Sequence, residues 1–390
     1  MSFRVGIAGS GYIARGLVLL LEDLPDLRVS RVLTRSEVNR RVDFPRPDLL
    51  TNNLAEVVQT SDVVVECSGD VLHATDVAEA VLAAGLPLVT MDAEMQVTTG
   101  SYFAGRGVFT EAEGDQPGCL AALHEDTVQM GFRPLVYGNV KGYLNHNPTR
   151  EDMEYWAARQ GIALDKVIAF TDGTKVQCEQ ALVANGLGAG IARDGLLAPS
   201  VGGLTPAAEL LASAAEQLGY PVADFVVAPS SPPGVFLVVT HADEQRPFLK
   251  YYKLGNGPHY LLLRNFHLCH LEVPKTLRRV LSGGPPLLHN SEHPSIGLAA
   301  VAKTDLEPGH RIDRGIGGWD VRGIAVRIAE NADYAPIGLM SGATITRSVR
   351  EGEMLLQSSV ELPPSPAHDA WREVHQRVLR QRGAGTILLE

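Results

Sequence analysis

The chain has 390 residues, 45% of them hydrophobic and 20% charged, so its length favours two or three globular domains over a single core. Its 39 glycines and 24 prolines are spread along the chain without a repeat, which disfavours a collagen-like or disordered protein. The net charge of −11 repels phosphate backbones and therefore disfavours a nucleic-acid partner.

Membrane and secretory signals are not found in the sequence. No apolar run approaches the roughly 20 residues that cross a bilayer, and the longest one near the N-terminus, Leu17 to Leu21, stops at Glu22. The N-terminus does not resemble a signal peptide, and the four cysteines form no C-x-x-C pair that would suggest a zinc site or a disulfide framework. We expect a cytoplasmic protein with no membrane partner.

The N-terminal residues predict a strand, a glycine turn and a helix, in that order. An apolar run over Phe3–Ala8 precedes the turn, and apolar residues over 13–24 follow it. In such a unit Gly9 permits a tight turn, Gly11 lets the backbone approach a pyrophosphate, and Ala14 allows close packing of helix and strand. The predicted cofactor-binding residues here are Gly9, Ser10, Gly11, Tyr12, Ile13 and Ala14.

Alternating strands and helices continue the pattern of a Rossmann domain. Strands are predicted over 29–33, 62–66 and 86–91, with a helix over 71–84. This context, more than the short glycine motif, predicts dinucleotide binding.

The residues after the second strand indicate which dinucleotide. An NAD-preferring site usually has an acidic residue there, bound to the ribose 2′-hydroxyl. Here Thr34, Arg35 and Ser36 offer a cation and two hydroxyls to a 2′-phosphate, so we predict NADP(H). The alternative is that Arg35 is an ordinary solvated arginine.

Small residues follow the third strand, where Rossmann folds pass a loop under the nicotinamide. Cys67, Ser68 and Gly69 suit such a close approach, and we predict that they bind the cofactor. Alternatively, Cys67 belongs to the core.

The middle of the chain is rich in glycine beside charged residues, a composition typical of active-site loops. Lys141 and Lys175 both lie in such loops. A lysine near a nicotinamide can transfer a proton to or from a substrate oxygen, or hold a substrate anion. A solvated loop lysine is the alternative for each. Lys141 follows an apolar run over 134–137, which we predict to be the last strand of the Rossmann sheet.

Several motifs together resemble one family of oxidoreductases. They are GSGYIARG, GDQPG, GNVKGYL, FTDGTK with EQALVAN, and YYKLGNGPHYL with HLCHLE. The chain resembles enzymes that join a homoserine-dehydrogenase-like Rossmann domain to a C-terminal SAF domain. One branch of that family, the 1-deoxy-D-xylulose 5-phosphate reductoisomerase-like enzymes, uses NADPH and a divalent metal.

The resemblance extends to a possible metal site. Asp92 and Glu94 resemble the Asp-x-Glu pair with which deoxyxylulose phosphate reductoisomerases hold their metal, so they would bind Mg²⁺ or Mn²⁺. Glu179 would be a third ligand or an acid. The alternative is a helix start, in which Asp92 caps a helix that carries Glu94 in its first turn.

The last third of the chain predicts a small β-rich module. From Gly297 onward, strands alternate with turn-rich segments, which resembles a SAF domain that would close over substrate or mediate assembly. The segment 369–382 predicts an amphipathic helix with Trp371, Val374 and Val378 on one side.

These expectations combine into an α/β protein of three domains. They are an NADP-binding Rossmann domain over 1–138, an α+β catalytic domain over 139–292, and a β-rich SAF-like domain with a C-terminal helix over 293–390. We expect an NADPH-dependent oxidoreductase or reductoisomerase acting on a small anionic, sugar-phosphate-like substrate, with Lys141 and Lys175 as proton-transfer or oxyanion groups oriented by Asp115. The alternatives are a homoserine-dehydrogenase-like alcohol dehydrogenase without rearrangement, and a non-catalytic NADP-binding sensor or assembly subunit. We also expect a homo-oligomer.

Overall fold

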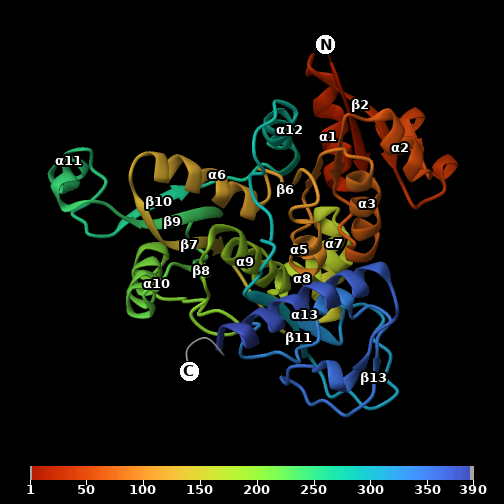
Figure 1. Ribbon diagram of the computed structural model, residues 1–390. Coiled ribbons are helices and arrows are strands. Elements are labelled where there is room, and N and C mark those ends of the chain that lie inside the picture. Colours follow the sequence, from red (N-terminus) through yellow and green to blue (C-terminus); the bar gives the residue numbers. More distant parts are fainter. Residues whose placement is uncertain (1, 387–390) are drawn as a thin grey trace. The chain divides into compact units, whose positions relative to one another are not determined.

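The computed structural model describes residues 2–386 (Figure 1). The chain divides into two compact units, each assembled from separate segments. Unit 1 comprises Met1–Gly118, Leu268–His293 and Pro364–Arg377, and unit 2 comprises Cys119–His267, Pro294–Pro363 and Val378–Glu390. Within the described part of the chain, no helix is both long and apolar enough to cross a membrane.

Unit 1 is built on a six-stranded parallel sheet with the strand order β3-β2-β1-β4-β5-β6. The strands are β1 (Phe3–Ala8), β2 (Leu27–Leu33), β3 (Leu50–Thr51), β4 (Val63–Glu66), β5 (Leu88–Thr90) and β6 (Phe109–Glu111). Its main helices are α1 (Tyr12–Glu22), α2 (Leu54–Thr60), α3 (Val71–Ala83) and α12 (Val273–Leu281). This order is that of a Rossmann fold, and it confirms the predicted fold class.

Both faces of this sheet are covered, as a parallel sheet requires. Val5 and Ile7 of β1 belong to a buried cluster that also includes side chains of α1 and α12, whereas Ala8 packs in a second cluster with α2 and α3. The alternation along β1 follows from the two-residue period of a strand. The carboxyl ends of the strands remain as the edge where ligands of such folds bind.

Unit 2 contains a second sheet with the strand order β10-β9-β7-β8. These strands are β7 (Arg133–Lys141), β8 (Val222–Val227), β9 (Gly234–Thr240) and β10 (Tyr260–Arg264). The prediction that residues 134–137 form the last Rossmann strand is wrong, because β7 pairs with β8 and β9 and the edge of the first sheet is occupied by β6. The apolar run identified a strand, but its paired residues lie 86 to 107 positions later and leave no local signal.

The helices of unit 2 include α7 (Arg150–Gln160), α8 (Leu164–Thr171), α9 (Thr174–Leu187), α10 (Leu204–Leu218) and α11 (Arg246–Tyr251). Helices α9 and α10 pack on β7 and β8. Residues 174–185 of α9 are all buried, since β11 (Ile296–Ala302) and β12 (Val321–Arg327) also pack against this helix. Three polar side chains of α9 form hydrogen bonds with backbone groups of this strand pair. They are Thr174, Gln177 and Asn185.

The C-terminal segment is β-rich, as predicted. It contains the antiparallel pairs β11–β12 and β13 (Thr344–Ile345) with β14 (Val360–Glu361). The predicted C-terminal helix is α13 (Pro366–Thr386), with Trp371, Val374 and Val378 buried. The resemblance to a SAF domain and the three predicted domain boundaries stay predictions.

Candidate active site

The glycine turn after β1 has the geometry of a phosphate-binding turn. Gly9 has a φ of +119°, and a Cβ there would lie 2.9 Å from the carbonyl carbon and oxygen of Cys67. Gly11 is the N-cap of α1 without a side-chain hydrogen bond, and a Cβ at Gly11 would meet nothing within 4 Å. The start of α1 therefore has no side-chain cap and leaves room beside Gly11, as anion binding at a helix start requires.

The loop after β2 is tied to this turn. Ser10 Oγ lies 2.8 Å from Thr34 Oγ1, and Arg41 donates to both Ser10 Oγ (2.8 Å) and the Ser10 carbonyl oxygen (2.9 Å). Asn52 Nδ2 donates to the carbonyl oxygens of Thr34 and Ser36. Sequence reasoning missed Arg41, because it lies outside the motif and 31 residues beyond the serine it contacts.

Arg35 is ion-paired in the structure. Its Nη1 lies 2.6 Å from Asp70 Oδ2, although 60% of the Arg35 side chain is exposed. Asp70 also caps α3 by accepting the backbone N–H of His73. Burial, followed by the nearby Arg35 charge, lowers the pKa of His73, so its imidazole is neutral near pH 7.

A cavity of about 380 Å³ lies beside these groups, at the carboxyl ends of β2 and β3. It is lined by Leu33, Thr34, Arg35, Glu37, Asn52, Leu54 and His73. This is the edge at which a Rossmann fold holds the adenosine half of a dinucleotide.

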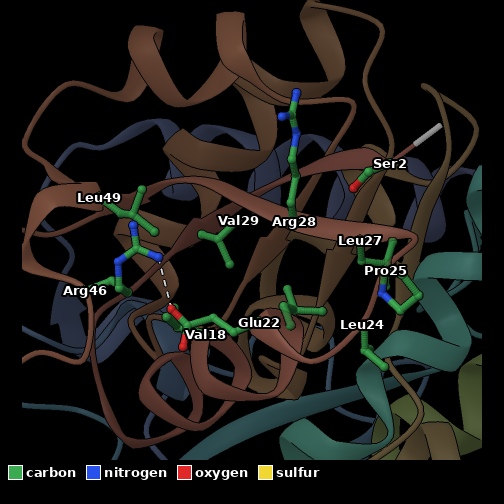
Figure 2. Close-up of a pocket in the computed structure, with 11 residues that line it drawn as sticks. Ser2, Val18, Glu22, Leu24, Pro25, Leu27, Arg28, Val29, Arg46 and Leu49 are labelled. Atoms are coloured by element: carbon green, nitrogen blue, oxygen red, sulfur yellow. Dashed lines mark hydrogen bonds and ion pairs between the residues drawn. The ribbon is translucent and has the colours of Figure 1, made fainter.

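A second cavity, of about 470 Å³, lies at the amino ends of the strands of the same sheet, and Figure 2 shows the residues that line it. Its lining comes from the end of α1, the segment before β2 and the start of β2, with an ion pair of 3.0 Å between Arg46 and Glu22. Because it lies at the amino ends of the strands, we do not assign the cofactor to it.

The loop after β4 is fixed by a buried carboxylate. Glu66 Oε1 accepts both the backbone N–H and the hydroxyl of Ser68, at 2.7 and 2.6 Å. Cys67 packs against the hydrophobic core, and burial raises the pKa of its thiol, which stays protonated. Gly69 has a φ of +64°, which a side chain would disfavour.

Asp92 and Glu94 adopt the helix-start arrangement. Asp92 Oδ1 accepts the backbone N–H of Met95 at 3.0 Å and caps the short helix α4 (Ala93–Met95), in which Glu94 is buried. No group of three or more His, Cys, Asp or Glu side chains in residues 2–386 is arranged to hold a metal ion. The metal site stays a prediction that this geometry does not support.

Asp115 lies in unit 1, with 9% of its surface exposed. Its Oδ1 accepts the backbone N–H of Gln116, where α6 (Gln116–Gln129) begins. The predicted lysines lie in unit 2, so the orientation of Lys141 and Lys175 by Asp115 stays a prediction.

Unit 2 brings two polar side chains, Lys141 and Asn139, onto the carboxylate of Glu179. Lys141 ends β7, and its Nζ lies 3.4 Å from Glu179 Oε2 on α9. Asn139 Nδ2 donates to the same oxygen at 2.9 Å. Only 1% of the Glu179 side chain is exposed, compared with 19% of the Lys141 side chain. A partly exposed ammonium therefore contacts a buried carboxylate.

Asn139 is the second residue, after Arg41, that sequence reasoning missed. It precedes Lys141 by two positions, and strand periodicity places both side chains on one face of β7. Gly138 faces the other side, where a Cβ would lie 2.0 Å from the ring of Phe236. The two-residue spacing of Asn139 and Lys141 within GNVKGYL was the sequence signal that could have identified Asn139.

Lys175 lies one helical turn before Glu179 on α9. A spacing of four residues places both side chains on the same helix face, and Lys175 is 9% exposed. Neither lysine is therefore a solvated loop residue. The structure joins Lys141 and Asn139 to Glu179, and helix spacing places Lys175 on the same face of α9 as Glu179, whereas the catalytic roles of these residues stay predictions.

Two family models match parts of the chain. Residues 9–102 match the NAD-binding domain of homoserine dehydrogenase, and residues 114–273 match the catalytic domain of the oxidoreductase DRL. The chain is an NAD(P)-dependent oxidoreductase. The first match contains the glycine turn and Arg35, and the second contains Lys141, Lys175 and Glu179. This oxidoreductase therefore carries its nucleotide motif and its lysine cluster in two different matched regions.

Solved structures with a similar arrangement are remote in sequence. The UDP-N-acetylglucosamine 3-dehydrogenase GnnA from Acidithiobacillus ferrooxidans is 12% identical with a TM-score of 0.43, over 74% of this chain and 92% of that one. A putative myo-inositol dehydrogenase from Sinorhizobium meliloti is 10% identical with a TM-score of 0.41, over 74% and 92%. A homoserine dehydrogenase from Thiobacillus denitrificans is 20% identical with a TM-score of 0.36, over 47% and 49%. No curated protein matches the sequence.

Proposed function

We propose that this oxidoreductase uses NADP(H) to interconvert a carbonyl and an alcohol on a small, anionic, polyhydroxylated substrate. The observation that carries the proposal is the buried Glu179 carboxylate that holds Lys141 at the end of β7. An ammonium so placed can donate to an oxygen that gains negative charge, which is the charge change of carbonyl reduction.

The residues at the first sheet fit the cofactor. The open start of α1 suits the pyrophosphate, and the cavity beside Thr34 and Arg35 suits the adenosine half. The neutral ring of His73 and the side chain of Leu54 line that cavity with flat and apolar surface. Arg35 supports NADP(H) over NAD(H), because a 2′-phosphate can accept from its guanidinium beside the existing partner Asp70.

The nicotinamide, when bound, supplies or accepts the hydride. Lys141 would donate a hydrogen bond and then a proton to the substrate oxygen during reduction, and would take the proton back in the reverse direction. Glu179 and Asn139 would hold the ammonium in place, so little reorganisation is needed when charge develops. Lys175 would supply a second positive charge on the same face of α9.

A spectrophotometric assay tests this proposal. NADPH consumption would be followed at 340 nm with a panel of ketose and aldose phosphates, their phosphate-free analogues, and short hydroxy-carbonyl acids. We expect turnover of phosphate- or carboxylate-bearing members, and much slower turnover with NADH. Equal turnover of the neutral analogues would overturn the anionic substrate, and equal rates with NADH would overturn the cofactor assignment.

A further inference from the structure

One arginine outside the glycine turn holds the middle residue of that turn by both its side chain and its backbone. Arg41 Nη1 donates to Ser10 Oγ at 2.8 Å, and Arg41 Nη2 donates to the Ser10 carbonyl oxygen at 2.9 Å. The hydroxyl of Ser10 also lies 2.8 Å from Thr34 Oγ1. Ser10 is therefore tied to two positions that follow β2.

The bond to the Ser10 carbonyl fixes the direction of a backbone donor. The peptide bond between Ser10 and Gly11 is trans, so its carbonyl and its N–H point in opposite directions. Because the carbonyl points to Arg41, the N–H of Gly11 points away from Arg41. Glycines flank Ser10 on both sides, and glycine has the widest choice of backbone conformations. Arg41 therefore restricts a turn that would otherwise have wide conformational freedom.

The segment that carries Arg41 is fastened at two further points. Asp43 Oδ1 accepts Arg41 Nε at 3.2 Å, and Asp43 Oδ2 accepts Nη1 of Arg15, near the start of α1, at 2.6 Å. Phe44 is only 2% exposed and belongs to the same core cluster as the buried side chains of α1. Residues 41–44, which we call the bracing segment, thus join the glycine turn to α1 and to the core of unit 1.

Arg41 is better placed to orient the turn than to bind a phosphate itself. Each of its three guanidinium nitrogens donates to a protein acceptor, and only 21% of its side chain is exposed. The planar fork of an arginine holds several acceptors at fixed angles, which the single ammonium of a lysine does not. Asp43 is shared by two arginines, so the group also leaves a net positive charge near the start of α1. Orientation and charge therefore predict different results for variants of this group.

We propose that Arg41 is a positioning residue for the dinucleotide, and that it holds the glycine turn in the conformation that receives the pyrophosphate. A turn that is fixed before binding loses little conformational freedom when the nucleotide binds, so the affinity is higher. The pyrophosphate is common to both nicotinamide dinucleotides. Arg41 therefore supports the binding of NADPH and NADH alike, whereas Arg35 is expected to distinguish them.

Fluorescence titration with NADPH and with NADH tests this role without turnover. Arg41→Met should raise both dissociation constants by a similar factor, roughly fivefold to fiftyfold. Arg46→Met is the matched control, because Arg46 is likewise paired with two carboxylates, Glu22 at 3.0 Å and Asp48 at 2.6 Å, but lines the cavity at the amino edge of the sheet (Figure 2). It should leave both constants within about twofold of the wild type. A loss for NADPH alone would place Arg41 on the 2′-phosphate and overturn the positioning role, as would unchanged binding of both nucleotides.

Asp43→Asn separates positioning from simple attraction of the phosphates. Asp43 is 55% exposed, so we expect the variant to fold. If Arg15 and Arg41 acted only as cations near the pyrophosphate, removal of the neighbouring negative charge would tighten nucleotide binding. If the bracing segment positions the turn, the same substitution should weaken the binding of both nucleotides, roughly twofold to fivefold. Unchanged or tighter binding would overturn the proposal.

A double-mutant cycle shows whether Arg41 acts through the turn. Ser10→Ala removes the hydroxyl that accepts from Arg41 Nη1. The double variant of Ser10→Ala and Arg41→Met should lose less affinity for NADPH than the product of the two single losses, because both substitutions remove the same contact. Losses that multiply would show that Arg41 acts elsewhere and would overturn the proposal. The inference rests on the NAD(P) dependence of this oxidoreductase and not on its substrate, so absence of turnover with every substrate would count against the proposed function and not against this role.

Discussion

The nucleotide edge of unit 1 and the α9 region of unit 2 are built in different ways. At the nucleotide edge, Gly9 adopts a positive φ and Gly11 precedes α1 without a side-chain cap, so the role of both residues depends on backbone conformation. In unit 2 the functional groups are side chains from distant segments. Lys141 meets a carboxylate 38 residues later, and Asp172 pairs with Lys303. The first site is encoded in a local motif, whereas the second exists only once the chain has folded.

This difference has energetic consequences. Backbone donors at a helix start remain in contact with solvent until a ligand binds, so they cost little to maintain. A buried ion pair must recover the cost of removing two charges from water, and loss of one partner leaves the other unpaired. Substitutions in the α9 region should therefore affect both chemistry and stability, and conservative variants are needed there.

Lys141 provides the largest expected effect. Lys141→Met removes the donor at the end of β7 and should lower kcat by roughly 10²–10³, with NADPH affinity unchanged because the nucleotide edge belongs to unit 1. Steady-state kinetics and NADPH fluorescence titration measure the two quantities. Lys250→Met, at an exposed position of α11, is the matched control. If Lys141→Met keeps kcat within about threefold of the wild type, Lys141 is a structural partner of Glu179 and Lys175 becomes the better candidate.

Asp224 extends the comparison to stability. This fully buried residue of β8 accepts the backbone N–H groups of Leu197, Ala198 and Phe225. Burial raises its pKa to about 6, against the opposing effect of those three donors and Arg193. Because the folded chain holds this proton more tightly than the unfolded chain, its contribution to stability is complete below pH 4 and is lost as pH rises through 6.

We expect the free energy of unfolding of the wild type to fall relative to Asp224→Asn by up to about 3 kcal/mol between pH 4 and pH 7. Urea denaturation at a series of pH values measures this difference. Parallel pH profiles for the two proteins would show that the three backbone donors, and not burial, determine the charge state of Asp224.

A substitution of Arg35 tests the proposed nucleotide site of unit 1. Arg35→Gln should weaken NADPH binding by roughly 1–3 kcal/mol, the range of a charge-assisted hydrogen bond, and leave NADH binding unchanged. Arg28→Gln is the control, since Arg28 is an exposed arginine of the same sheet that lines the cavity at its amino edge (Figure 2). Equal losses for both nucleotides would mean that Arg35 acts by holding Asp70.

Much of unit 1 could be predicted from the sequence because its signals are local. The alternating strands and helices and the glycine turn gave the Rossmann fold and its ligand edge. The partners of β7 could not be predicted, since they depend on packing with β8 and β9. Asn139 could have been inferred from its two-residue spacing to Lys141. The Lys303–Asp172 pair has no sequence signal, because 131 residues separate its members and only the fold joins them.

Substitution of Asp92 should have the smallest effect, and it distinguishes helix capping from metal binding by this carboxylate. As the N-cap of α4 it accepts the Met95 N–H, so Asp92→Ala should lower the free energy of unfolding by about 1 kcal/mol. Asp76→Ala, at an exposed position within α3, should change it by less than about 0.5 kcal/mol. Because Asp92 acts as a cap and no group of three or more potential ligands is arranged for a metal among residues 2–386, we also expect full activity in EDTA. If EDTA abolishes turnover but not NADPH binding, and Mg²⁺ or Mn²⁺ restores turnover, Asp92 and Glu94 bind a metal in the working enzyme and the reaction moves toward a reductoisomerase.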